Sequence, residues 1–199
     1  MTTADIRTRI EGAGGTTLVL VHGFGCALED WDAVTPRLAA RHRCIALDLP
    51  GHGASVLPDR PSIATLADAV NHVRLRAGGD RQVLVGHSLG AKVIREAFCR
   101  RPEKIAGLVL IDGALYQGDC QALAGVMAAK IDAMGFAAFA AEHFETMFGA
   151  RSPAALRHAM IARGAARDPA FARSLNPDAV LFDHARGIET LEQIDVPVL

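Results

Sequence analysis

Ser88 stands between two glycines in a pattern that is typical of an activated hydroxyl group. Residues 86–90 have the sequence Gly-His-Ser-Leu-Gly, which fits the G-x-S-x-G elbow motif. A serine at the tip of a sharp strand-to-helix turn has a strained backbone, so the residues two positions away on either side must lack a side chain. Its hydroxyl projects over a helix N-terminus, where the dipole favours developing negative charge. The pattern therefore indicates a nucleophilic serine, and the alternative is an ordinary tight turn with an idle serine.

The residues around Ser88 supply the strand and the helix that such a turn requires. A short apolar run rich in valine occupies residues 82–85. After the turn, apolar residues recur with helical spacing on one face, at Leu89, Val93, Ile94, Ala97 and Phe98. The spacing predicts a strand before Ser88 and a helix after it.

The first half of the chain alternates between expected strands and expected helices. Strands are predicted at residues 16–21, 43–48 and 105–112, with a short edge strand at 4–10. Helices are predicted after Trp31 and from an N-cap at Ser62 to about residue 77. This alternation predicts an α/β fold with a doubly wound, mostly parallel sheet.

Polar residues stand where the predicted parallel strands end. They are His22, Asp48, Ser88 and Asp112. In sheets of this kind, binding and catalytic sites lie beyond the carboxyl ends of the strands. The shared position of these residues therefore supports a site built around Ser88.

Composition limits what the chain can bind. The 199 residues form one domain by length, and the formal net charge of −1 argues against nucleic acid or an anionic membrane surface as a partner. Residues 1–5 are polar and lack an apolar signal core, and no apolar run approaches membrane-spanning length. The expected compartment is the cytoplasm. Four scattered cysteines have no metal-ligand spacing, so they are expected to be reduced, and the sequence implies no metal and no cofactor.

From residue 114 to about 188 the pattern changes to consecutive helices without a strand. Helices are predicted at 119–134, 136–148, 153–166 and 176–186, with breaks at Gly135, Pro153, Pro169 and Pro177. An all-helical insertion between strands of one sheet is typical of a lid. The expected organisation is therefore a core at 1–113, a helical cap at 114–187 and the start of a C-terminal core part at 188–199. Phe136 and Phe139 give the cap an apolar face, and each is expected to pack inside the cap or to contact a substrate.

Four motifs, in order along the chain, resemble those of the α/β-hydrolase superfamily. They are His22-Gly23-Phe24-Gly25, residues 48–53 (Asp-Leu-Pro-Gly-His-Gly), residues 86–90 and residues 108–112 (Leu-Val-Leu-Ile-Asp). The resemblance spans about residues 16–199 and points to the small, lidded esterase, carbon–carbon hydrolase and haloperoxidase-like members. It implies a mostly parallel sheet with a helical cap after the sixth strand. A serine in place of an aspartate at the elbow argues against the dehalogenase and epoxide-hydrolase branches.

The resemblance implies catalytic roles for three residues. Ser88 would attack an acyl carbon and form a covalent acyl-enzyme. The backbone N–H groups of Leu89 and Phe24 would form the oxyanion hole.

It also implies which residues surround the substrate. His22, His52 and His87 would support loop and elbow geometry rather than act as the base. The expected partner is a small acyl substrate, and the residues expected to contact it are Phe24, His87, Phe136 and Phe139.

The chain departs from the family pattern in the rest of the triad. The family order is serine, acid and then histidine, with the acid after the seventh strand and the histidine near the C-terminus. Residues 194–199 resemble the start of that seventh strand, so both positions would lie beyond Leu199. Asp112 is an alternative acid, because some members place it after the sixth strand. Three later histidines lie in the expected cap and are not expected to act as the base: His143, His158 and His184.

Two expectations follow for the fold and the activity. C-terminal strands are missing, so the chain is expected to be a truncated portion of a longer hydrolase, or to be completed by another copy through an open sheet edge that invites self-association. Without a base, Ser88 is a weak nucleophile. The expected function is a serine hydrolase of carboxylic ester or related acyl substrates, with impaired activity in these 199 residues. The alternatives are a non-catalytic relative that binds a small ligand, and an enzyme that acts with peroxide or on a carbon–carbon bond.

Overall fold

A computed structural model of the protein describes residues 6–113 and 118–199. The polar start of the chain, the first residues of the edge strand expected at 4–10 and the first residues of the cap expected at 114–187 lie outside the described residues. Among the helices of the described ranges, none combines the length and the apolar character that crossing a bilayer would need.

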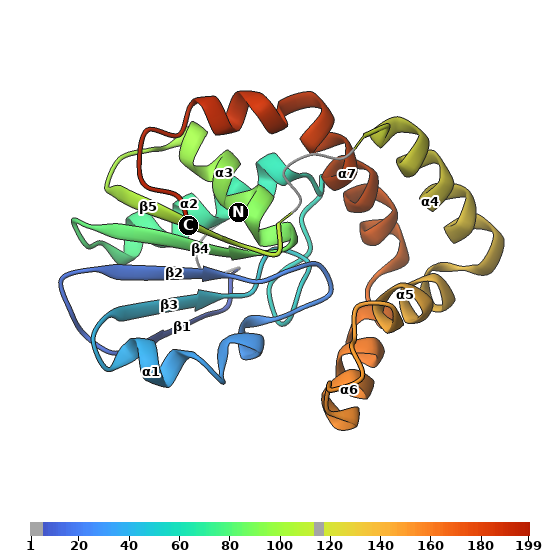
Figure 1. The fold of residues 1–199 in the computed structure, drawn as a ribbon, viewed down its shortest axis with the longest axis horizontal. Helices are drawn as coiled ribbons and strands as arrows, with labels where there is room; N and C mark the ends of the chain where they lie inside the picture. Colours follow the sequence, from blue (N-terminus) through green and yellow to red (C-terminus); the bar gives the residue numbers. More distant parts are fainter. Residues whose placement is uncertain (1–5, 114–117) are drawn as a thin grey trace.

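Five strands form one sheet at the centre of the molecule (Figure 1). They are β1 (Thr8–Glu11), β2 (Thr17–Val21), β3 (Arg43–Leu47), β4 (Gln82–His87) and β5 (Ile105–Ile111). Their order in the sheet is β1-β3-β2-β4-β5, and only β1 runs antiparallel to its neighbour. The predicted mostly parallel sheet is therefore confirmed.

Helices cover both faces of this sheet, because its strands are apolar on both sides. Those from the first half of the chain are η2 (Leu28–Trp31), α1 (Thr35–Ala39), α2 (Ile63–Ala77) and α3 (Leu89–Arg100). In β2, Val19 and Val21 face the larger core, to which α2 and α3 contribute. Leu18 and Leu20 face the opposite core, which η2 and α1 cover. The Ser62 hydroxyl accepts a hydrogen bond from the first turn of α2, as predicted for an N-cap. The doubly wound α/β arrangement is confirmed.

Four helices follow in the second half of the chain. They are α4 (Cys120–Met134), α5 (Phe136–Glu145), α6 (Ala154–Ala165) and α7 (Pro169–Glu192). The first three agree with the predicted helices, although α5 ends earlier than expected. The helix predicted at 176–186 lies within α7, but its bounds and the break predicted at Pro177 are wrong, because α7 begins at Pro169 and continues through Pro177. Pro169 occupies the first helical position, where a missing N–H is tolerated, and the Asp168 carboxylate caps the helix.

Packing on both sides of Pro177 explains why α7 stays helical there. Before the proline, the Phe171 side chain is buried in the larger core. After it, the buried Asp183 carboxylate forms ion pairs with Lys92, at 2.5 Å, and with Arg95, both on α3. These contacts offset the ~3 kcal/mol that a proline inside a helix costs. The division of the chain at residues 113/114 and 187/188 stays a prediction, and α7 runs across the second of these positions.

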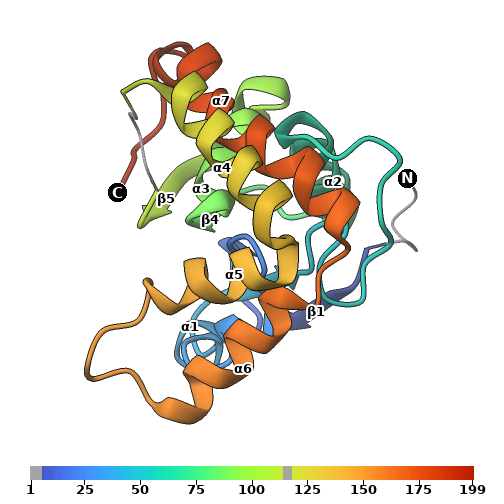
Figure 2. The same ribbon diagram turned by 90° about the vertical axis from the view of Figure 1, so that its right-hand side faces the viewer.

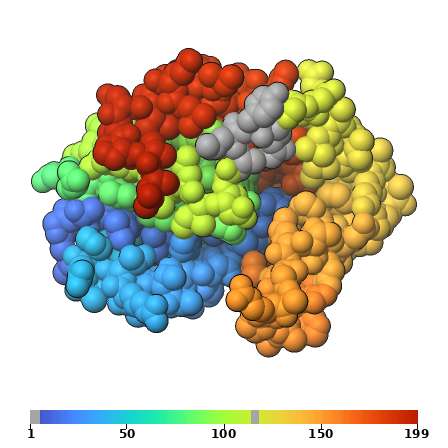
Figure 3. Space-filling model, viewed as in Figure 1, coloured from blue at the N-terminus to red at the C-terminus, as the bar shows by residue number. Residues whose placement is uncertain are grey.

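The helices α4, α5 and α6 and the first part of α7 gather at the end of the sheet where the parallel strands finish (Figures 1 and 2). A separate apolar cluster joins them, formed by Ile131, Phe136, Phe139, Ala140, Phe144 and Ala172. Phe24, from the loop after β2, packs against this cluster. In the space-filling view, α5 and α6 form an orange lobe beside the blue N-terminal part of the core (Figure 3). The cap therefore rests on the loops that follow the strands.

The last residues of the chain pair with β5 as a further parallel segment. The Leu108 N–H donates to the Pro197 carbonyl at 3.0 Å, and the Leu199 N–H donates back to the Leu108 carbonyl at 3.0 Å. The Leu110 N–H donates to the Leu199 carbonyl at 2.8 Å. The expectation that the segment after the helices leads into a new strand is therefore confirmed. Self-association through the sheet edge stays a prediction.

Candidate active site

Ser88 lies at the turn between β4 and α3 in the strained conformation that the motif predicts. Its φ is 52° and its ψ is −114°. A Cβ placed on Gly86 would overlap the backbone of Gly90, and one placed on Gly90 would overlap the Val21 carbonyl at the end of β2. The Ser88 N–H donates to the Ile111 carbonyl at 2.9 Å, which fixes the turn to the end of β5. The glycine pattern is thus required by close backbone approach on both sides of the serine.

The loop that follows β2 lies directly against this turn. The position that a Cβ would occupy on Gly23 is 3.3 Å from the Ser88 Cβ and 3.2 Å from the His87 Nδ1. A side chain on residue 23 would therefore crowd both His87 and Ser88. Phe24, the next residue, is therefore held beside the serine.

Two backbone N–H groups at this junction are unused. Among the described residues, neither the Phe24 N–H nor the Leu89 N–H donates a hydrogen bond to another residue. Leu89 is the first residue of α3, so its N–H also lies at the positive end of a 12-residue helix. Unpaired donors beside a strained serine are what stabilisation of a tetrahedral oxyanion requires.

The described residues place no acid or base at the serine hydroxyl. The Ser88 Oγ does not cap α3 and forms no hydrogen bond with any described residue. Asp112 follows β5 directly, has a φ of 48° and is exposed, and its carboxylate forms no hydrogen bond or ion pair within the described ranges. The His143 ring lies in the cap, where it stacks on Phe139 with 5.6 Å between ring centroids. The structure thus brings together Ser88, Phe24 and Leu89, and not the rest of a triad.

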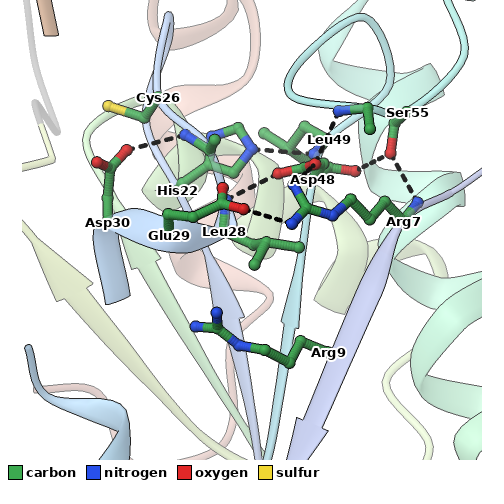
Figure 4. Close-up of polar contacts among 12 residues, drawn as sticks. Arg7, Arg9, His22, Cys26, Leu28, Glu29, Asp30, Asp48, Leu49 and Ser55 are labelled. Atoms are coloured by element: carbon green, nitrogen blue, oxygen red, sulfur yellow. Dashed lines mark hydrogen bonds and ion pairs between the residues drawn. The ribbon is translucent and has the colours of Figure 1, made fainter. Parts of the chain in front are cut away.

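His22 is a structural residue that joins two loops of the site, and Figure 4 shows its contact with Leu49. Both of its ring nitrogens form hydrogen bonds. Its Nε2 accepts a hydrogen bond from the Leu49 N–H at 3.0 Å, so its Nδ1 carries the proton and donates to the Gly23 carbonyl at 2.7 Å. Burial lowers the pKa of His22 to about 4, although the Gly23 carbonyl acts in the opposite direction. Because both ring nitrogens already form hydrogen bonds, this neutral imidazole cannot act as a base for Ser88.

Asp48 joins the same two loops from the end of β3 (Figure 4). Its buried carboxylate accepts hydrogen bonds from the Leu28 N–H at 2.7 Å and the Ala54 N–H at 2.9 Å, and it lies 3.3 Å from an Arg7 guanidinium nitrogen. A Cβ on Gly53 would overlap this carboxylate. Asp48 was predicted to lie at the site because it follows a strand. In the structure it holds the two loops of the site through hydrogen bonds to their backbone.

The cap residues expected at the substrate are mostly buried within the cap. Phe136 and Phe139 are 4% and 6% exposed and belong to the apolar cluster of the cap. Phe136 also meets Phe24 edge-on, with 6.4 Å between ring centroids. Contact of these rings with a substrate stays a prediction.

Two arginines at the site were not singled out from the sequence. Arg163, in the last turn of α6, and Arg167, between α6 and α7, both donate to the Gly25 carbonyl of the loop that carries Phe24. Nothing in their local sequence distinguishes them from the other arginines of the chain, because their partners lie far away along it.

The cysteine in this loop does not account for the site. Burial raises the pKa of the Cys26 thiol to about 12, and the nearby Asp30 carboxylate acts in the same direction, so the nucleophilic thiolate is disfavoured. Among residues 6–113 and 118–199, no group of three or more His, Cys, Asp or Glu side chains could hold a metal ion.

A family model described as "alpha/beta hydrolase fold" matches residues 16–161. The chain therefore belongs to the α/β-hydrolase fold family. The family resemblance drawn from the four motifs is confirmed.

Individual proteins are similar to all or part of this chain. The "Dihydrolipoyllysine-residue acetyltransferase component of acetoin cleaving system" of Pseudomonas putida is 42% identical over 104 residues, which are 52% of this chain and 28% of that protein. A "Pimeloyl-[acyl-carrier protein] methyl ester esterase" of Edwardsiella ictaluri is 35% identical over 100 residues, which are 50% of this chain and 37% of that protein. Among solved structures, the esterase RhEst1 from Rhodococcus sp. ECU1013 is 27% identical, with a TM-score of 0.74 over 97% of this chain and 74% of that one. The matches to the two curated relatives thus span little more than a third of their length at most.

Proposed function

We propose that this chain carries the nucleophile and the oxyanion hole of a serine hydrolase for small carboxylic esters or related acyl compounds. The Ser88 Oγ attacks the acyl carbon, the leaving group departs with a proton, and the acyl-enzyme that remains is hydrolysed by water. The observation that carries the proposal is a pair of N–H groups, on Phe24 and Leu89, that donate to no described residue and lie beside a serine in a strained turn. The esterase names of several relatives favour an ester as the acyl substrate.

The two N–H groups would act where negative charge develops. Each donor of an oxyanion hole contributes on the order of 10²–10³ in rate, because it is already oriented when the charge forms. The N-terminus of α3 adds its dipole at the same point. The backbone at this junction is thus suited to acyl transfer more than to the binding of a neutral ligand.

We infer that these 199 residues on their own turn over esters slowly. A serine hydroxyl needs a base to remove its proton, and the Ser88 Oγ has no such partner among the described residues. Asp112 stays a candidate acid, because it immediately follows the residue whose carbonyl binds the Ser88 N–H. Because no described residue acts as the base, a second function is also considered: a non-catalytic relative that binds a small apolar ligand.

Reaction with an alkyl fluorophosphonate separates these two functions. The Ser88 Oγ would form a bond to phosphorus with loss of fluoride, and intact-mass and peptide-mass measurements would place the adduct. We expect slow labelling of the unaltered chain at Ser88, because its hydroxyl has no base among the described residues, none in Ser88→Ala, and little turnover of a p-nitrophenyl ester. Absence of an adduct both in this chain and in a version extended to include the family's C-terminal histidine would exclude the hydrolase and favour the ligand-binding relative. Ester turnover at the ordinary rate of an esterase would show that a base is present.

A further inference from the structure

The cap holds the loop that carries the Phe24 N–H through two arginines. The Arg163 Nε donates to the Gly25 carbonyl at 3.3 Å. The Arg167 Nη2 donates to the same carbonyl at 3.4 Å and to the Cys26 carbonyl at 3.3 Å. These carbonyls belong to the two residues that follow Phe24, so the guanidinium groups restrain the backbone that orients its N–H.

Asp30 connects Arg163 to the later part of the loop, at Ala27. The Arg163 Nη2 lies 2.6 Å from both carboxylate oxygens of Asp30. One of these oxygens also accepts the Ala27 N–H at 2.8 Å. The two side chains are only 29% and 24% exposed, so solvent screens this pair less than it would a fully exposed one. A single carboxylate thus joins the cap to the backbone three residues after Phe24.

The Phe144 ring of the cap also packs against the loop, close to these polar contacts. Gly25 has a φ of 71°, and a Cβ placed on it would overlap the Phe144 ring. A Cβ on Gly164 of α6 would overlap the same ring, so Phe144 fills the space between the loop and α6. The Phe144 ring also stacks on Phe24, with an interplanar angle of 11° and 6.4 Å between centroids.

The core, in contrast, holds the two ends of the loop, at the Gly23 carbonyl and through the Asp48 carboxylate at the Leu28 N–H. The Gly23 carbonyl accepts hydrogen bonds from the His22 Nδ1 at 2.7 Å and from the Cys26 N–H at 3.2 Å. The Phe24 N–H belongs to the same planar peptide as the Gly23 carbonyl, so these bonds set the direction of the N–H. The cap arginines bind the carbonyls of the next two residues and so restrain how far this peptide can turn.

We propose that Arg163 and Arg167 are positioning residues, which hold the Phe24 N–H where the oxyanion forms, so that the oxyanion hole is complete only when the cap is docked. This inference rests on the proposed function, in which Phe24 is an oxyanion donor. Neither arginine touches the reacting atoms, and both act through the Gly25 carbonyl. Loss of their contacts should slow the chemical step and leave the initial binding of a reagent nearly unchanged.

The test compares the unaltered chain with Arg163→Ala and with Arg157→Ala as a matched control. Arg157 is also on α6, but it pairs with Glu145 inside the cap and does not touch the loop. For labelling by a fluorophosphonate, we expect kinact to fall about tenfold in R163A, part of the 10²–10³ that a lost donor costs, with KI within about twofold. R157A should keep both constants. Hydrogen–deuterium exchange of a peptide covering residues 22–30 should be faster in R163A alone.

A second variant keeps the test decisive if R163A does not fold. Asp30→Asn removes the charge partner of Arg163 without shortening the side chain, and it should lower kinact and speed exchange in the same direction. Unchanged kinact with faster exchange, or unchanged exchange in R163A and D30N, would overturn the positioning role. An equal rise of KI in all three variants would show a general loosening of the cap and would also overturn it. If neither the unaltered chain nor the version extended to include the family's C-terminal histidine labels at Ser88, the proposed function fails, and the exchange measurement alone decides whether the cap arginines hold the loop.

Discussion

Lowering the pH from 7 to 5 should destabilise the protein through His22, and replacing this residue should remove that part of the loss. His22 is buried, and its Nε2 accepts the Leu49 N–H, so the folded protein keeps the ring neutral. Burial lowers its pKa to about 4 from the value of 6.5 that an exposed histidine has. The unfolded chain therefore takes up a proton at a higher pH than the folded protein does. The stability contributed by this group is complete above about pH 6.5 and is lost as the pH falls toward 4.

The size of the effect follows from the two pKa values. Their difference corresponds to about 3 kcal/mol of unfolding free energy once the pH is below both. At pH 5 the unfolded imidazole is almost fully protonated, whereas the folded ring is still mostly neutral. The loss between pH 7 and pH 5 is therefore about 2 kcal/mol.

Urea unfolding of the unaltered protein and of His22→Gln at both pH values measures this loss. The difference in unfolding free energy between the two proteins should shrink by about 2 kcal/mol from pH 7 to pH 5. Burial also lowers the pKa of His52, so only the comparison with the variant isolates His22. His72→Gln, at an exposed position of α2, should keep the full pH dependence of the unaltered protein. If the unaltered protein and His22→Gln lose the same free energy, the argument from the buried neutral ring is refuted.

Two further predictions concern how the cap is attached. Asp183→Asn leaves the buried Lys92 and Arg95 without their carboxylate and should cost about 3–5 kcal/mol in urea unfolding, whereas Asp68→Asn, at an exposed pair with Arg100, should cost less than about 1 kcal/mol. If the two variants lose the same unfolding free energy, the ion pairs of Asp183 with Lys92 and Arg95 do not hold α7 to α3 as the structure indicates. Phe144→Ala should destabilise the cap by about 3–5 kcal/mol, seen as faster hydrogen exchange in α5 and α6, whereas Met147→Ala at a position 57% exposed should change little. Unchanged exchange in Phe144→Ala would mean that the cap does not depend on this ring.

The sheet could be predicted from the sequence because its signals are local. The run at β2 is apolar on both faces, and each strand is followed within a few residues by a glycine, a proline or a helix start. The long helix α7 could not be predicted, because Pro177 is a local signal for a break. What keeps the helix intact is packing by Phe171 and ion pairing by Asp183, and these partners come from distant parts of the chain.

The same distinction applies to the site. Ser88, Leu89 and Phe24 could be located because each belongs to a short motif whose glycines lie close to neighbouring backbone or side-chain atoms. The contact between Arg163 and Asp30 joins residues 133 positions apart, and neither residue is part of a motif. Only the folded arrangement of α6 over the loop after β2 brings them together.

The central claim, that Ser88 attacks an acyl group whose oxyanion binds the Phe24 and Leu89 N–H groups, is tested most directly by amide NMR of the phosphonylated protein. In a ¹⁵N-labelled sample, both amide protons should move downfield when the fluorophosphonate adduct forms at Ser88, because each then donates to the phosphoryl oxygen. The Gly107 amide, on β5 and away from the turn, should not move. An adduct at Ser88 that leaves the Phe24 and Leu89 amide shifts unchanged, or an adduct on another residue, would contradict the claim.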